Sequence, residues 1–168
     1  MKQTTEAKND YSATESKTAI RIHFICRGNT FRSRMAEAII RSQQLSNVTP
    51  SSSGINADED QNGKIAYWGK TQLKRHKKLK YAAKKWRQTT QAMIDGSDIV
   101  VVVAPDIYAS MKNKWHIPKQ KLHVWNVHDL EETINAERMA MTEKNKAIVS
   151  ERIYNQLDQL TNELLVTL

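Results

Sequence analysis

The chain has 168 residues and a formal net charge of +8. Its length suits one domain that buries a core without disulfides or a structural metal. A single cysteine excludes an internal disulfide, a multi-cysteine zinc site and a Cys-x-x-Cys redox pair, and it indicates a reducing compartment. The N-terminal residues are polar and no run approaches 18 apolar residues, so we expect no signal peptide, no membrane segment and a cytoplasmic protein.

Residues 1–18 hold few apolar side chains and many Lys, Glu, Thr and Ser, which predicts a disordered tail before a folded domain over residues 19–168. After the tail, short β-branched runs alternate with stretches of helical pattern. One of these runs is continuously apolar, as expected of a strand covered by helices on both faces. The pattern predicts an α/β protein with three layers. The four expected strands are 20–25, 48–53, 99–103 and 121–127.

Helices are expected between these strands and at the C-terminal end. One follows the first strand over about 33–45, and an amphipathic helix over about 135–165 carries apolar residues three to five positions apart. Residues 58–80 are harder to interpret, and one short helix between glycines is expected there. The segment Lys70–Arg87 has nine Lys or Arg residues and no acid, a pattern typical of a solvated helix face.

Cys26 follows the first strand and begins the loop Cys26-Arg27-Gly28-Asn29-Thr30-Phe31-Arg32-Ser33. In an open parallel sheet, ligands bind beyond the carboxyl ends of the strands, where a loop leads into the next helix. Inward-pointing backbone N–H groups of residues 27–32, with the positive end of the following helix, would hold an anion such as phosphate there. The same field favours the thiolate of Cys26, which is a competent nucleophile.

The other loop residues suit that chemistry. Arg32, six residues after the cysteine, can fork two N–H donors onto two phosphoryl oxygens. Gly28 lets the backbone approach a phosphate closely, and Asn29 tolerates a left-handed conformation. Ser33 can donate its hydroxyl to the thiolate or cap the helix. Cys-x5-Arg alone is a weak signal, whereas its place between a strand and a helix, with Gly-Asn inside and Ser behind, is more specific.

These residues resemble the low-molecular-weight protein tyrosine phosphatases, whose signature is Cys, five residues, Arg and Ser, with Gly-Asn inside the loop. The resemblance extends to Ser52-Ser53-Gly54 and to the apolar third strand, and it covers about residues 20–165. It implies a four-stranded parallel sheet of flavodoxin-like order, a phosphatase domain over 19–168, a cysteinyl-phosphate intermediate, and neither metal nor cofactor. Cys26 and Arg32 would be catalytic, and the phosphate would be bound by Arg27, Gly28, Asn29, Thr30, Phe31 and Ser33.

The resemblance also implies an aspartate general acid after the fourth strand, where relatives carry Asp-Pro. This chain has Asp129 followed by a leucine. A carboxyl group after the fourth parallel strand emerges at the same edge as Cys26, where it can protonate the leaving oxygen and then deprotonate the attacking water. We therefore assign Asp129 as the acid and base. Glu131, Glu132 and His128 are the possible substitutes.

The residues around the loop bear on the substrate, which we expect to be a phosphorylated protein or peptide that releases inorganic phosphate. Many relatives have aromatic walls beside the pocket where this chain has Asp58-Glu59-Asp60 and Glu131-Glu132, and an acidic rim suits a cationic substrate. In having a threonine at this loop position, Thr30, the chain resembles the bacterial protein-arginine phosphatases of the same fold. Phosphotyrosine is the first interpretation and phosphoarginine the alternative. Tyr67 and Trp68 either line the pocket entrance or pack against the sheet.

Two departures from the family concern the loop itself. In eukaryotic relatives a histidine supports the loop asparagine, and the aligned residue here is Lys84, so that hydrogen bond is missing or rebuilt. The second loop cysteine of many relatives is Phe31 here. This chain therefore lacks the disulfide that would protect the first cysteine from oxidation.

A non-enzymatic alternative stays open. The chain would then be a catalytically inactive module that binds phosphate or nucleic acid, with RNA held by the basic segment Lys70–Arg87, which contains two aromatic residues. The intact set of Cys26, Arg32 and Asp129 argues against such a relic, because binding alone needs neither a nucleophile nor an acid. We expect a monomeric enzyme.

Overall fold

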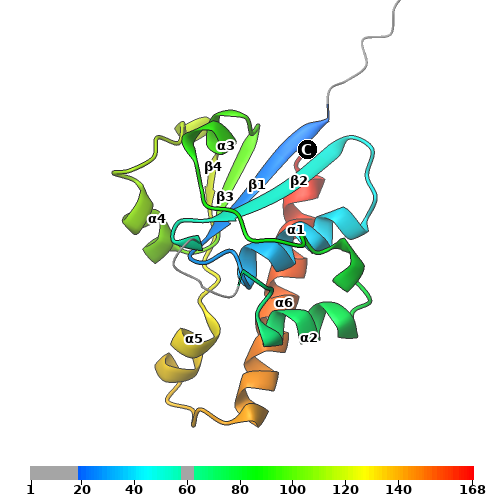
Figure 1. Ribbon diagram of the computed structural model, residues 1–168, viewed down its shortest axis with the longest axis vertical. Coiled ribbons are helices and arrows are strands. Elements are labelled where there is room, and N and C mark those ends of the chain that lie inside the picture. Colours follow the sequence, from blue (N-terminus) through cyan, green and yellow to red (C-terminus); the bar gives the residue numbers. More distant parts are fainter. Residues whose placement is uncertain (1–18, 58–62) are drawn as a thin grey trace, which may run out of the picture.

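The computed structural model describes residues 19–57 and 63–168, and these form a four-stranded sheet with helices around it (Figure 1). All three strand pairs are parallel and the order is β2-β1-β3-β4, which confirms the predicted sheet. The predicted tail at 1–18 and the acidic residues at 58–60 lie outside the described residues. The strands are β1 Ile20–Cys26, β2 Val48–Gly54, β3 Ile99–Val102 and β4 Leu122–Val124.

Helices cover both faces of the sheet and give the predicted three layers (Figure 1). α1 and α6 pack on one face together with α2 and α5, and α3 and α4 pack on the other. The α-helices are α1 Arg32–Ser42, α2 Tyr67–Arg75, α3 Gln91–Asp95, α4 Pro105–Met111, α5 Leu130–Ala136 and α6 Glu143–Val166, and the short 3-10 helices are η2 Leu79–Tyr81 and η3 Lys119–Lys121.

The central strands are apolar on both faces, and each face packs against its own helices. Ile22 and Phe24 of β1 pack with α1 and α6, whereas Ile25 packs with α3 and α4, as the alternation of side chains along a strand requires. Val101 and Val102 of β3 divide between the two faces in the same way. This division explains why the third strand is continuously apolar.

The C-terminal segment is two helices, not the single helix that the sequence predicted. α5 ends at Ala136 and α6 begins at Glu143. The hydroxyl of Thr142 accepts the Asn145 N–H at 3.2 Å and caps the new helix. Between the helices, Arg138 has a φ of 53°, a conformation through which a right-handed helix cannot continue.

The fourth strand is also shorter than predicted, but the chain stays beside β3 after β4 ends. The Trp125 N–H donates to the Val102 carbonyl at 2.8 Å, and the Val127 N–H donates to the Val103 carbonyl at 2.9 Å. These bonds carry the chain to the carboxyl edge of the sheet. Asp129 follows two residues later, at the start of α5.

Candidate active site

Cys26 is the last residue of β1 and its side chain is buried. Its Sγ lies 2.9 Å from the Ser33 Oγ and accepts the Asn29 N–H at 3.2 Å. α1 begins at Arg32, so the sulfur lies close to the positive end of that helix. Hydrogen-bond donors and a helix N-terminus both stabilise a thiolate relative to a thiol.

Asn29 is fully buried and has a φ of 54°, the left-handed conformation that its residue type tolerates. All the hydrogen-bonding groups of its side chain are used. The amide NH₂ donates to the Ser33 Oγ at 2.9 Å and to the Ser52 Oγ at 2.8 Å, and the amide oxygen accepts the Arg87 N–H at 2.8 Å. These bonds hold a turn of the loop that would otherwise be strained.

Two glycines let neighbouring segments pack closely on the loop. At Gly54, the end of β2, a Cβ atom would lie 2.6 Å from the Arg27 carbonyl oxygen and 2.6 Å from the Asn29 nitrogen. At Gly69, in α2, a Cβ atom would lie 2.9 Å from the ring of Phe31. Since the first contact is with backbone and the second with a side chain, only Gly54 leaves no room for adjustment.

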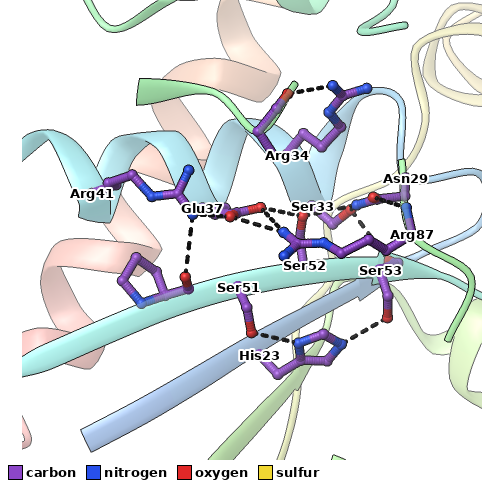
Figure 2. Close-up of polar contacts among 12 residues, drawn as sticks. His23, Asn29, Ser33, Arg34, Glu37, Arg41, Ser51, Ser52, Ser53 and Arg87 are labelled. Carbon is purple, nitrogen blue, oxygen red and sulfur yellow. Dashed lines mark hydrogen bonds and ion pairs between the residues drawn. The ribbon is translucent and has the colours of Figure 1, made fainter. Parts of the chain in front are cut away.

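A buried carboxylate, Glu37 of α1, completes the support of the loop (Figure 2). Its side chain is fully buried and accepts hydrogen bonds from Ser52, Arg41 and Arg87. A carboxylate can only accept hydrogen bonds, so Ser52 donates to Glu37 and in turn accepts from Asn29.

This order of donors extends to the cysteine. The Asn29 NH₂ that donates to Ser52 also donates to Ser33, so the Ser33 hydroxyl proton can turn to the Cys26 sulfur at 2.9 Å or to the Ser53 carbonyl oxygen at 3.4 Å, and the sulfur is the nearer of the two. Glu37 therefore fixes the direction of the hydrogen bonds at Ser52, and the Asn29 amide, oriented by the Arg87 N–H, makes Ser33 an acceptor on that side.

Arg87 provides the support for the loop asparagine that the lysine at position 84 cannot provide. Its backbone N–H bonds to Asn29, while its guanidinium donates to both oxygens of Glu37 at 2.9 Å. Sequence reasoning missed both Glu37 and Arg87. The only sequence signal for Glu37 was an arginine four residues later, Arg41, at the spacing of a helical ion pair.

Arg32 joins the Cys26 loop to the segment after β4. Its side chain is 3% exposed, its Nη1 donates to the Val127 carbonyl at 2.9 Å, and its Nη2 lies 3.4 Å from the Asp129 carboxylate. Cys26, Arg32 and Asp129 thus meet at one edge of the sheet, although they come from three different elements.

Asp129 is the N-cap of α5, in a capping box. Its carboxylate accepts the Leu130 N–H at 2.9 Å, and the Glu132 carboxylate accepts the Asp129 N–H at 3.4 Å. The capping box fixes the backbone where relatives use proline. Glu132 also pairs with His128 at 2.9 Å, whereas Glu131 lines the pocket described next. Of the acids after β4, Asp129 is the one that contacts Arg32.

A pocket of about 280 Å³ adjoins the Cys26 loop between α2 and α5. Tyr67 and Trp68 meet edge to face in its α2 wall, with ring centroids 5.0 Å apart, and Trp68 also packs against the core. Trp68 therefore both lines the pocket and packs inward, whereas Tyr67, which is 69% exposed, only lines the pocket. The pocket is lined by Thr30, Phe31, Ala66, Tyr67, Trp68, Asp129, Leu130 and Glu131.

His23 of β1 supports β2 from within the sheet. Its ring nitrogens lie 2.7 Å from the Ser51 hydroxyl and 2.7 Å from the Ser53 hydroxyl (Figure 2). Burial, followed by the positive charge of Arg87, lowers the pKa of His23 to about 4. The ring is therefore neutral at physiological pH, and it links β1 to β2 through its hydrogen bonds to Ser51 and Ser53.

Arg27, the other arginine of the loop, forms an ion pair with a residue of another element. It pairs with Asp106 of α4 at 3.1 Å, and both side chains are about half exposed. Within residues 19–57 and 63–168, no group of three or more His, Cys, Asp or Glu side chains is arranged to hold a metal ion. None of the helices in that part of the chain has the length and apolar character needed to cross a membrane.

Comparison with known proteins identifies the family. Residues 21–168 match the family described as low molecular weight phosphotyrosine protein phosphatase. The chain belongs to this family. The protein is therefore a phosphatase, as its Cys26 loop predicts. A search of curated protein sequences finds no match.

Solved structures of low-molecular-weight phosphatases share the fold. A low molecular weight protein tyrosine phosphatase from T. tengcongensis has a TM-score of 0.71 and 20% identity over 89% of this chain and 100% of that one. Wzb from Vibrio vulnificus, solved with benzylphosphonate, has a TM-score of 0.68 and 17% identity over 89% of this chain and 99% of its own. The YwlE arginine phosphatase from Geobacillus stearothermophilus has a TM-score of 0.60 and 22% identity over 88% of this chain and 94% of its own. At these identities the likeness establishes the fold alone.

Proposed function

We propose that the protein hydrolyses phosphotyrosine in proteins or peptides through a phosphocysteine intermediate on Cys26. The observation that carries the proposal is the position of the Cys26 Sγ at the start of α1, with the Ser33 hydroxyl and the Asn29 N–H directed at it. A buried cysteine that served only packing would need no such donors. Arg32 of the same loop has the guanidinium fork that suits a phosphate clamp.

The reaction has two steps. In the first, the Cys26 sulfur attacks phosphorus and an S–P bond forms as the P–O bond to tyrosine breaks. Asp129 gives its proton to the leaving oxygen, while Arg32 and the N–H groups of residues 27–32 stabilise the charge on the phosphoryl oxygens. In the second, Asp129 takes a proton from water, whose oxygen attacks phosphorus and breaks the S–P bond. Inorganic phosphate leaves and the thiolate is restored.

The lining of the pocket favours an aromatic substrate. Phe31 lines it from the Cys26 loop, Tyr67 and Trp68 line it from α2, and Asp129 lines it from the start of α5. Aromatic pairs contribute about 0.5–1.5 kcal/mol beyond the burial of their area. The relative Wzb was solved with benzylphosphonate, which carries a phenyl ring, and this supports the same interpretation.

Phosphoarginine is a second candidate, supported by two other pocket residues. Thr30 and Glu131 line the pocket, and a hydroxyl and a carboxylate can both accept hydrogen bonds from a guanidinium. YwlE from Geobacillus stearothermophilus, which has the same fold, is an arginine phosphatase.

Phosphate release from matched phosphotyrosine and phosphoarginine peptides, across about pH 5 to 8, tests both candidates. Faster release from phosphotyrosine supports the proposal, and faster release from phosphoarginine would assign Thr30 and Glu131 as specificity residues instead. Cys26→Ser is the blank, and Asp129→Asn should lower kcat. If neither peptide is hydrolysed while phosphate still binds, both candidate substrates are wrong.

A further inference from the structure

The outer face of α2 forms a basic groove, lined by Tyr67, Lys70, Thr71, Lys74 and Arg75, with a volume of about 590 Å³. These positions are three or four residues apart and therefore share one face of the helix. The opposite face, which includes Gly69, Gln72 and Leu73, is buried against the protein. α2 thus has one face for packing and one face for solvent or a partner.

The groove begins at the candidate active site. Tyr67 lines both the groove and the pocket beside Cys26, and it is 69% exposed. The start of α2 is held against the Cys26 loop, because the Ala66 N–H donates to the Thr30 carbonyl at 2.7 Å. A substrate whose phosphorylated side chain enters the pocket would therefore lay its adjoining residues over Tyr67 and along the groove.

Of the three cations that line the groove, one forms an ion pair with an acid in the described part of the chain. Lys70 and Lys74 are exposed, and no carboxylate in the described part of the chain forms an ion pair with either of them. At the far end, Arg75 pairs with Glu151 of α6 at 2.9 Å. The sequence has no Asp or Glu between residues 61 and 94. An acidic partner would therefore meet two cations that are ready to pair.

We propose that this groove binds acidic residues that adjoin the phosphorylated residue of a protein substrate. The inference rests on the proposed function and adds the charge of the substrate to it. The acids Asp129 and Glu131 line the pocket, whereas the cations line the groove on α2, so the acidic residues of the substrate are expected along α2 and not on the α5 side. A peptide suits the groove better than RNA, because the groove leads out of a pocket for one phosphorylated side chain. RNA binding also uses several stacking rings in succession, and the groove has one, Tyr67.

Binding can be measured without turnover in the Cys26→Ser protein. We would compare fluorescein-labelled phosphotyrosine peptides of equal length that carry three acidic residues before or after the phosphotyrosine with a neutral peptide. With two exposed ion pairs, at least one acidic peptide should bind about tenfold more tightly than the neutral one. The preference should shrink as salt is raised from about 0.05 to 0.5 M.

Charge reversal at the two lysines locates the effect. Lys70→Glu with Lys74→Glu should abolish the preference for the acidic peptide and leave hydrolysis of p-nitrophenyl phosphate within about twofold, because neither lysine forms an ion pair with a described residue. Lys112→Glu with Lys119→Glu, two exposed lysines on the α4 side of the sheet, is the matched control for net charge and should keep the preference. Lys70→Gln with Lys74→Gln avoids placing acids near the C-terminal end of α2 and should lower the preference about threefold.

Three outcomes would overturn the inference. Equal binding of all peptides, or an equal loss of the preference in the control pair, would show that the groove is not the site. RNA binding that depends on Lys70 and Lys74, with no effect on peptides, would assign the groove to nucleic acid instead. If p-nitrophenyl phosphate is not hydrolysed by the wild-type protein, the proposed function fails, whereas loss of peptide preference alone leaves that function intact.

Discussion

Replacing Glu37 by glutamine tests whether a buried charge directs the hydrogen bonds of the Cys26 loop. The Glu37→Gln change keeps the size of the side chain and adds an NH₂ group. If the new amide oxygen faces Ser52, the NH₂ faces the guanidinium donors of Arg41 and Arg87. If the NH₂ faces Ser52, the hydroxyl proton of Ser52 is turned toward the NH₂ of Asn29. Either arrangement places two donors against each other.

The expected magnitudes follow from the exposure of the partners. A hydrogen bond to a charged group contributes about 1.5–3 kcal/mol, but the side chains of Arg41 and Arg87 are 38% and 37% exposed, so water replaces part of the loss. We expect the free energy of unfolding to fall by about 2–3 kcal/mol. We expect kcat to fall about tenfold, because the opposed donors displace the Asn29 amide, directly or through Arg87, and that amide holds Ser33 beside the sulfur; about 1.4 kcal/mol is a factor of ten in rate.

Three measurements check this prediction: kcat with p-nitrophenyl phosphate, the rate of Cys26 alkylation by iodoacetamide at about pH 6, and urea unfolding. Glu163→Gln, on the exposed side of α6, is the matched control and should change none of them. Ser52→Ala interrupts the same chain of hydrogen bonds, so its effect on kcat should not add to that of Glu37→Gln. Additive effects, or lower stability with unchanged kcat and alkylation, would refute the reasoning.

Three further predictions concern the loop and the sheet. Gly54→Ala should lower kcat/KM about a hundredfold in steady-state kinetics, because the loop backbone has to move by several tenths of an ångström; Gly69→Ala, which meets only the Phe31 ring, should have a smaller effect. The folded-state pKa of His23, about 4, lies below its ordinary value of 6.5, so the unfolded chain binds a proton that the folded protein does not. Stability should therefore fall by roughly 3 kcal/mol as the pH falls from about 6.5 to 4, and His23→Asn should flatten urea unfolding midpoints across that window. Arg32→Lys should lower phosphate release about a hundredfold, because lysine lacks the fork of the guanidinium.

The architecture was predictable from local pattern because its strongest signals are local. A continuously apolar run such as 99–103 has few alternatives to a strand between two layers of helix. The Cys-x5-Arg-Ser pattern likewise predicts a loop between a strand and a helix. The break between α5 and α6 was missed because the apolar residues that indicated the helix all lie within α6, and their spacing does not define where that helix begins. Thr142 was the available signal, since a threonine before a run of helix formers favours an N-cap.

The support of the loop was not predictable, because it depends on how distant segments meet. Glu37 and Arg87 are 50 residues apart, and neither belongs to a recognisable motif. Gly54 was noted as part of a family pattern, but its reason is the distance between β2 and the loop backbone, which only the packed structure defines. Asp129 lacks the proline that follows it in relatives, and the capping box with Glu132 restrains the backbone there instead.

A buried carboxylate behind a loop that binds phosphate would oppose anion binding unless its charge were balanced. Glu37 is flanked by Arg41 and Arg87, so the cluster as a whole is positive while the carboxylate still directs its hydrogen bonds. The groove on α2 adds exposed positive charge along the approach of a substrate. Salt screens exposed charges more than buried ones. Raising the salt concentration should therefore increase KM for an acidic phosphopeptide more than for p-nitrophenyl phosphate, and an equal increase for both would place the effective charge at the loop alone.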